Sequence, residues 1–256
     1  MKTGAPFDLA GRAALVTGSS AGIGWAVART LAEAGARVAL HGLESVEHLR
    51  GLAARLPGGA AAVPVFSLDL GDAGQAEVLA DGARAARGHV DILVLCASGQ
   101  FTRAWTDITA GEFTRQVDVN LRATLILLQR LVPPMQARRW GRVVAIGSVQ
   151  QVKPHKEMLV YAGTKAAQLS WMRNLATQVA GDGVTMNNVA PGCIDTARNA
   201  EALAVPGMRE AVKATIPSRR LGTPDDCAGT VLLLCSEQGS YINGADIAVD
   251  GGLGVT

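Results

Sequence analysis

Short apolar runs alternate along the whole chain with longer stretches rich in Ala and Leu. The short runs lack the apolar/polar alternation of half-exposed strands, which is typical of strands covered by helices on both faces. Repeated strand–helix–strand units of this kind predict an α/β fold, a doubly wound parallel sheet flanked by helices on both faces. We expect seven strands, at residues 13–16, 38–40, 63–66, 92–95, 143–146, 184–189 and 247–249.

The stretches between these runs have the length and composition of crossover helices. We expect helices at residues 23–34, 46–56, 75–86, 113–138, 160–180 and 224–236. No linker, repeat or low-complexity tract interrupts the pattern, so residues 1–256 are expected to form a single domain. Residues 191–217 stand apart as a long, charged segment that follows a strand. Because ligands bind beyond the carboxyl ends of parallel strands, we predict that this segment is a lid over a binding site.

Composition and charge narrow the class of protein. A hydrophobic content of 48% excludes a mostly disordered chain. The 24 Lys and Arg residues are scattered and nearly balanced by 22 Asp and Glu residues, so nucleic acid is not an expected partner. Residues 1–10 do not resemble a signal peptide and no apolar run reaches spanning length, so we expect a cytoplasmic protein with no membrane partner. No metal site is expected, because the cysteines lack zinc-site spacing: Cys96, Cys193, Cys227 and Cys235.

A glycine-rich loop joins the first expected strand to the first expected helix. Its sequence is Thr17-Gly18-Ser19-Ser20-Ala21-Gly22-Ile23-Gly24. Glycines allow a sharp turn and a close approach of the backbone to a ligand, and the start of a helix offers free N–H groups and a positive dipole end to phosphate. The loop between a strand and a helix therefore predicts a dinucleotide-binding site.

The end of the second strand leaves the choice of dinucleotide open. An acidic residue there would bind the ribose diol of NAD, and an Arg nearby would bind the 2′-phosphate of NADP. The segment His41-Gly42-Leu43 offers neither. Without a fixed cation we favour NAD, with NADP as the alternative if Arg37, His41 or His48 reaches the phosphate. Asp69, after the third strand, is either a partner of the adenine amino group or a helix N-cap or turn residue.

Two side chains with proton-transfer chemistry lie four residues apart in the expected helix at 160–180. Tyr161 and Lys165 project from one face of that helix, where the ammonium favours the phenolate form of the tyrosine. Ser148 follows the fifth strand at the edge of the sheet where ligands bind, and its hydroxyl can hold a substrate oxygen. Asn120 is a poor helix former inside a long expected helix, which points to a buried polar role such as kinking the helix and binding water.

Together these residues resemble the classical short-chain dehydrogenase/reductase family over residues 17–252. Thr17-Gly18-x-x-x-Gly22-Ile23-Gly24 matches the family's cofactor loop, Asp69-Leu70 its adenine-site pair, and Asp250-Gly251-Gly252 its C-terminal close. Pro191-Gly192-x-Ile194-x-Thr196 resembles its nicotinamide-side motif. The resemblance implies a Rossmann-type fold, a homotetramer, and hydride transfer between a nicotinamide cofactor and a secondary alcohol or ketone, without a metal.

The resemblance also implies roles for individual residues. Tyr161 is the general acid/base, Lys165 lowers its pKa and binds the nicotinamide ribose, Ser148 positions the substrate oxygen, and Asn120 holds a relay water. One stretch departs from the family, because Leu95-Cys96-Ala97-Ser98 stands where the family has Asn-Asn-Ala-Gly. The expected cofactor contacts are Gly18, Ser20, Ala21, Gly22, Ile23, Gly24, His41, Gly42, Leu43, Asp69, Leu70, Ala97, Tyr161, Lys165, Pro191, Gly192, Ile194 and Thr196.

The substrate is narrowed by comparison with the family's 3-hydroxybutyrate dehydrogenases, which His41-Gly42-Leu43 and Gln100 resemble. Those enzymes carry a carboxylate-binding Lys where this chain has Met158, and a His where it has Gln150. We therefore expect a neutral, hydroxyl-rich substrate such as a sugar or polyol, bound by Gln100, Ser148, Gln150, Met158 and Tyr161. An acidic substrate remains an alternative if Lys153, His155, Lys156 or Arg198 binds its carboxylate. The alternatives are an NADPH-dependent 3-oxoacyl-thioester or ketone reductase, and a non-catalytic dinucleotide-binding module.

Overall fold

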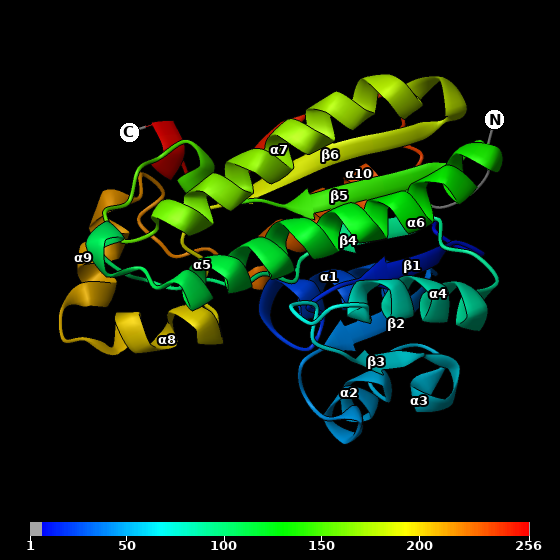
Figure 1. Cartoon of the computed structure of the whole chain (residues 1–256), viewed down its shortest axis with the longest axis horizontal. Helices are drawn as coiled ribbons and strands as arrows, with labels where there is room; N and C mark the ends of the chain where they lie inside the picture. The colour runs from blue at the N-terminus through cyan, green and yellow to red at the C-terminus, as the bar shows by residue number, and fades with distance from the viewer. Residues whose placement is uncertain (1–6, 256) are drawn as a thin grey trace.

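Seven parallel strands form one sheet in the order β3-β2-β1-β4-β5-β6-β7 (Figure 1). The computed structural model describes residues 7–255. The N-terminal segment that does not resemble a signal peptide was residues 1–10, and residues 1–6 of it lie outside the described residues. The doubly wound α/β fold and all seven strands are confirmed. β3 begins at Val65 rather than 63, because Pro64 has no N–H for the ladder and contributes only its carbonyl, to Leu40. The strands are β1 Ala13–Val16, β2 Arg37–Gly42, β3 Val65–Ser67, β4 Ile92–Leu95, β5 Gly141–Ile146, β6 Val184–Pro191 and β7 Asp246–Val249.

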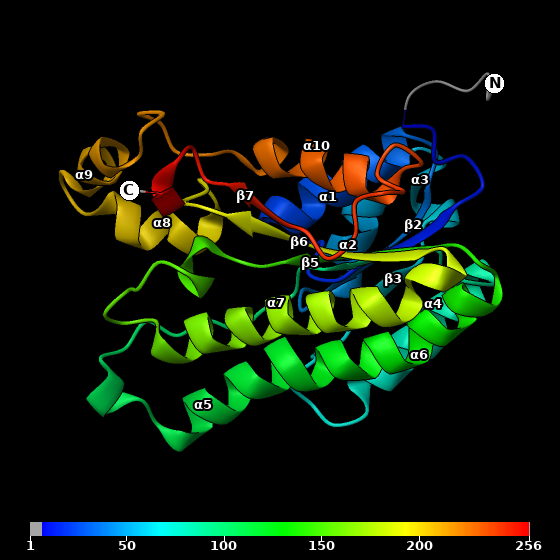
Figure 2. The ribbon, with the colours of Figure 1, turned by 90° about the horizontal axis from the view of Figure 1, so that it is seen from above.

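Helices cover both faces of the sheet (Figure 2). One core cluster lies between the sheet and helices α1 and α10, and a second lies between the sheet and helices α4, α6 and α7. Every residue of β1, β4, β5 and β6 is buried, which explains why the strand runs show no polar alternation. The helices are α1 Gly22–Glu33, α2 Val46–Ala53, α3 Gly59–Ala62, α4 Gln75–Arg87, α6 Ala123–Ala137, α7 Leu159–Val179 and α10 Pro224–Cys235.

The prediction of a single helix at residues 113–138 is wrong. The structure has α5 (Ala110–Val117), a π-helical turn (Asp118–Arg122) and then α6. The cause lies in Asn120, whose side chain accepts the Gly99 N–H at 2.7 Å and donates to the Gly99 carbonyl at 3.0 Å. Fixing this buried amide against a loop from β4 displaces the helical ladder by one residue, a distortion often found at functional sites.

The 191–217 segment lies beyond the carboxyl ends of the strands, as expected, but much of it is helical (Figure 1). It contains α8 (Ala197–Ala204) and α9 (Met208–Thr215). The topology explains its position. The chain runs from β1 to β2 and β3 on one side of β1 and then crosses to β4 on the other side. This reversal opens a crevice at the carboxyl edge, where doubly wound proteins bind ligands.

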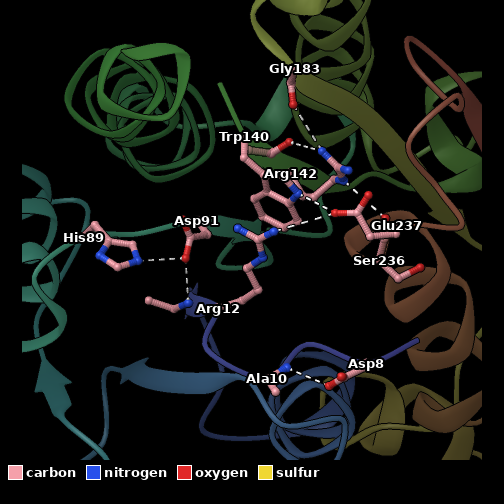
Figure 3. A network of polar contacts seen from close by, with 12 residues as sticks. Asp8, Ala10, Arg12, His89, Asp91, Trp140, Arg142, Gly183, Ser236 and Glu237 are labelled. Carbon is pink, nitrogen blue, oxygen red and sulfur yellow. Dashed lines mark hydrogen bonds and ion pairs between the residues drawn. The ribbon is translucent and has the colours of Figure 1, made fainter. Parts of the chain in front are cut away.

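The opposite edge of the sheet is closed by a cluster of charged and aromatic side chains (Figure 3). The Arg12 and Arg142 guanidinium carbons lie 3.6 and 4.3 Å from the centroid of the Trp140 ring, and Trp140 donates to Glu237 at 2.7 Å. Arg142 is buried and donates to the carbonyls of Gly141, Gly183 and Ser236. These contacts tie β5 to the end of α10. Within residues 7–255, no helix combines the length and apolar character needed to cross a bilayer.

Candidate active site

A cavity of about 580 Å³ opens at the carboxyl edge of the sheet. All the cofactor- and substrate-binding residues predicted from the sequence line it, including Ser148, Tyr161 and Lys165. Asn120 does not line the cavity. It is fully buried behind it and bonded to Gly99 and Thr164. The residues gathered here come from the ends of β1, β2, β3, β4, β5 and β6, which only a parallel sheet brings to one edge.

The glycine-rich loop has the shape that a diphosphate requires. Gly18 and Gly22 have positive φ values of 63° and 54°, and a Cβ at Gly18 would lie 2.9 Å from the Ala97 backbone. No side chain caps α1, whose first turn contains no acidic residue. An anion therefore meets uncapped N–H groups and the positive end of the helix dipole. These residues fit a nicotinamide dinucleotide.

Tyr161 lies in the first turn of α7 and is buried. Burial raises the pKa of its phenol, and the Arg198 charge together with hydrogen bonds to Ser148 and Arg198 opposes that rise. Lys165 lies one turn further along α7, with Nζ 5.7 Å from the centroid of the Tyr161 ring. Its ammonium donates to the Ile146 carbonyl at 2.8 Å, and burial lowers its pKa to about 7. The Arg198 cation therefore also favours the Tyr161 phenolate in this structure, a contribution that the sequence did not predict.

The matching family model is described as enoyl-(acyl carrier protein) reductase and covers residues 18–254. The bovine dehydrogenase/reductase SDR family member 4 is 35% identical over 94% of this chain and 86% of its own. The 3-oxoacyl (acyl-carrier-protein) reductase of Agrobacterium tumefaciens C58, solved with NADP, is 40% identical over 96% of this chain and 95% of its own, at a TM-score of 0.89. The gluconate 5-dehydrogenase of Burkholderia cenocepacia J2315, solved with NADP and tartrate, is 30% identical over 98% of each chain, at a TM-score of 0.90.

The chain belongs to the short-chain dehydrogenase/reductase family. Both the expected family and the Rossmann-type fold are confirmed. This short-chain dehydrogenase/reductase is an NAD(P)-dependent oxidoreductase that interconverts alcohols and ketones, and its cofactor is a nicotinamide dinucleotide.

An acidic side chain that the sequence analysis missed lies at the end of β2 in this short-chain dehydrogenase/reductase. Glu44 lines the cavity, and a Cβ built on Gly42 would meet its Oε2 at 2.5 Å and Ser20 Oγ at 2.7 Å. Partial burial works to raise the pKa of Glu44, but hydrogen bonds from Ser20 and from backbone groups outweigh it, so the pKa lies below its usual value. The sequence reading stopped at Leu43, one residue too early.

His41 lines the cavity as expected, but it is not a cation for a phosphate. Its Nδ1 accepts the Gly18 N–H and its Nε2 donates to the Leu68 carbonyl, both at 3.1 Å. Burial lowers its pKa to about 4, so the ring is neutral at pH 7. Arg37 begins β2 at the opposite edge of the sheet. The imidazole therefore fixes the glycine-rich loop against β2 and β3.

This buried imidazole makes the stability of the protein sensitive to acid. As the pH falls from 6.5 towards 4, the unfolded chain binds a proton that folded His41 refuses, so the free energy of unfolding falls. The loss contributed by His41 reaches about 3 kcal/mol near pH 4. Urea unfolding across this range checks the prediction. His41→Asn should flatten the slope and His48→Asn, at an exposed position, should not; equal slopes in all three proteins would contradict it.

A second residue missed by sequence reasoning connects Lys165 to Asn120. Gln168 is buried, accepts from Lys165 Nζ at 3.0 Å and donates to the Asn120 carbonyl at 2.8 Å. The Asn120 carbonyl also accepts from Thr124 Oγ1 at 2.8 Å. An amide side chain thus bridges Lys165 and Asn120, the residue that was expected to hold a relay water. Its position three residues after Lys165 on the same helix face was the available signal.

Proposed function

We propose that this enzyme oxidises a secondary hydroxyl of a polyhydroxylated small molecule, a sugar or polyol, with NAD as the favoured cofactor. The observation that carries the proposal is at Gln150, whose Oε1 is buried and has no hydrogen-bond partner among the described residues. A buried amide oxygen without a donor costs free energy, and a substrate hydroxyl supplies the donor. Gln100 adds a second amide to the same cavity and Met158 adds an apolar wall.

We assign the reacting oxygen of the substrate to Tyr161 and Ser148. Ser148 holds the oxygen, and Tyr161 takes the proton during oxidation and returns it during reduction. Lys165 binds the nicotinamide ribose, while Asn120 and Gln168 hold Lys165 in place. When bound, the nicotinamide accepts or supplies the hydride. Holding the donor and acceptor carbons in line is the main contribution of the surrounding cavity.

The preference for NAD rests on the charge at the end of β2. Glu44 is anionic at neutral pH and lies beside Ser20 and Gly42, where it favours a ribose diol and repels a 2′-phosphate. His41 is neutral, so it offers no compensating cation. The reductase and the gluconate dehydrogenase described above were both solved with NADP. The charge of Glu44 and these relatives therefore point to different dinucleotides, and measured affinities for NADH and NADPH distinguish them.

Glu44→Gln is expected to reverse or erase this preference. Removing one negative charge from the ribose end should tighten NADPH binding about tenfold and weaken NADH binding several-fold. Fluorescence titrations of each reduced cofactor, at one salt concentration, measure both constants. Glu47→Gln is the matched control, because Glu47 lies on α2 and does not line the cavity. Tighter NADPH than NADH binding by the wild type would overturn the NAD assignment.

The substrate assignment is tested by steady-state oxidation of a panel of alditols, sugars and simple secondary alcohols with NAD and NADP. We expect kcat/KM to increase with the number of hydroxyl groups, because each one can pair with Gln100 or Gln150. Gln150→Ala should remove most of that increase. The kcat/KM for a simple alcohol such as 2-butanol should stay within about twofold of the wild-type value. Equal loss on every substrate would contradict the assignment.

A reductive function is the second candidate. The 40% identity to a 3-oxoacyl (acyl-carrier-protein) reductase solved with NADP supports it. NADPH-dependent reduction of a 3-oxoacyl thioester, at rates above those of alditol oxidation, would favour this candidate.

For either function we propose a homotetramer. The exposed ring of Tyr241 lies close to edge strand β7, and it supports this assembly as a contact with another copy of the chain.

A further inference from the structure

Arg198 spans the mouth of the cavity from α8 to the end of β4. Its Nη1 donates to Ser98 Oγ at 2.8 Å and its Nη2 donates to the Ser98 carbonyl at 2.9 Å. The same side chain lines the cavity together with Tyr161, and its charge works to lower the pKa of the Tyr161 hydroxyl. Arg198 therefore lies beside the atom that exchanges the proton, although it is 37 residues from Tyr161 in the sequence.

The charges that line the cavity are separated along its length. The two acidic side chains among the described lining residues, Glu44 and Asp69, follow β2 and β3, and Asp69 is paired with Arg115 at 2.7 Å. At the Tyr161 end the formal cations are Lys165 and Arg198, and Lys165 already donates to two acceptors. Arg198 is thus the cation of the catalytic end of the cavity that stays fully charged at neutral pH.

Among the described residues, Arg198 has no carboxylate partner, which distinguishes it from Arg209, the other guanidinium of the 191–217 segment. Arg209, on α9, pairs with Asp195 at 2.7 Å. Among residues 7–255, no carboxylate pairs with Arg198; its hydrogen-bond acceptors are the hydroxyl and the carbonyl of Ser98. Arg198 is exposed, and a guanidinium that neutral groups hold in one orientation is well suited to bind a planar carboxylate.

We propose that Arg198 binds a carboxylate of the substrate, so that the polyhydroxylated substrate is a hydroxy acid. This inference rests on the proposed function and specifies its substrate class. The position of the acid group follows from the geometry. Because Arg198 and Tyr161 line the same end of the cavity and the Arg198 charge acts on the Tyr161 hydroxyl, we place the carboxylate on the reacting carbon or on the carbon next to it. Gln150 and Gln100 then bind the remaining hydroxyl groups.

Ser98 orients this guanidinium. The family has Gly at this position, which would leave only the carbonyl to accept from Arg198. The Ser98 hydroxyl adds a second acceptor, so two Nη groups are fixed at once. Ser98→Ala should therefore weaken binding of the acid by about tenfold, a smaller effect than the loss of Arg198. The cation remains in this variant, but its orientation is no longer fixed.

The test compares an aldonate with the alditol of the same carbon chain. For the wild type with NAD, we expect a higher kcat/KM on the aldonate than on the alditol. Arg198→Met should lower the aldonate-to-alditol ratio about 100-fold, and Arg198→Lys should retain part of it. Calorimetric titration of the cofactor-free protein with aldonate should show the same order of affinities. Arg209→Met, which removes a guanidinium outside the cavity lining, should leave the ratio unchanged.

Other outcomes identify which assignment fails. The cofactor diphosphate is also an anion; if Arg198→Met weakens NADH binding and lowers both substrate rates equally, Arg198 serves the cofactor and the inference is wrong. Oxidation of alditols in preference to aldonates by the wild type would also overturn the inference while leaving the proposed function standing. Oxidation of neither compound, with reduction of a 3-oxoacyl thioester, would overturn the proposed function itself. Thermal unfolding of each variant checks that it is folded.

Discussion

Tyr161→Phe is expected to lower kcat about a thousandfold, the range in which positioned acid–base groups contribute. The substitution removes one hydroxyl and keeps the buried ring, so the sheet, the cavity and Lys165 should be undisturbed. NADH affinity should stay within several-fold of the wild type, because only one contact to the ribose is lost. Single-turnover hydride transfer, followed by NADH absorbance, measures the chemical step separately from product release.

The chain provides its own control for this prediction. Its other tyrosine, Tyr241, is fully exposed and lies outside the cavity lining, so Tyr241→Phe should leave the single-turnover rate unchanged. A Tyr161→Phe enzyme that retains a tenth or more of the wild-type rate would place the proton transfer on another group. If neither the wild type nor the variant turned over any alcohol or ketone while both bound NADH, the protein would be a dinucleotide-binding module without catalysis.

Gly24→Ala is expected to weaken dinucleotide binding at least 100-fold and to lower Tm by about 5 °C. A Cβ at this position would lie 2.1 Å from the Gly18 carbonyl oxygen, far inside the van der Waals contact distance. Either the loop or the first turn of α1 must move, and both present N–H groups to the phosphates. Fluorescence titration with NADH and a thermal melt measure the two effects.

The matched control for this prediction is another helical glycine. Gly229 lies inside α10, where an added Cβ meets no atom within 4 Å. Gly229→Ala should leave NADH binding unchanged and raise stability by up to about 1 kcal/mol, because alanine is the better helix former. Wild-type affinity in Gly24→Ala would mean that the loop adapts freely and that its tight packing is not required for binding.

Local sequence patterns predicted the parts of this protein that depend on neighbours along the chain. Apolar runs without alternation identified all seven strands, because a strand covered by helices on both faces is mostly apolar rather than polar at every second position. The glycine-rich loop, Ser148, and Tyr161 with Lys165 were found from spacing within single segments, and the structure gathers them in one cavity. The direction of each crossover, and hence the site at the carboxyl edge, follows from the rules of parallel sheets.

The position of a residue in a strand or a motif did not predict which charged side chains lie at the two ends of the cavity. Glu44 follows a strand that had seemed to end in neutral residues, and only the folded backbone shows its carboxylate against Ser20. His41 had been a candidate cation, but burial and two hydrogen bonds keep its ring neutral. The charge of a titratable group depends on its surroundings, and those are set by packing rather than by sequence neighbours.

The sequence by itself determined the doubly wound sheet, the family, the glycine-rich loop and the positions of the proposed proton-transfer residues, because hydrophobic periodicity and short motifs are local properties. Only the tertiary structure decided the contacts between distant segments. Asn120 breaks a long helix by bonding to Gly99, Gln168 joins Lys165 to Asn120, and Arg198 reaches Ser98 across 100 residues. Such pairs have no period in the sequence, since they form where separate elements meet at the carboxyl edge of the sheet.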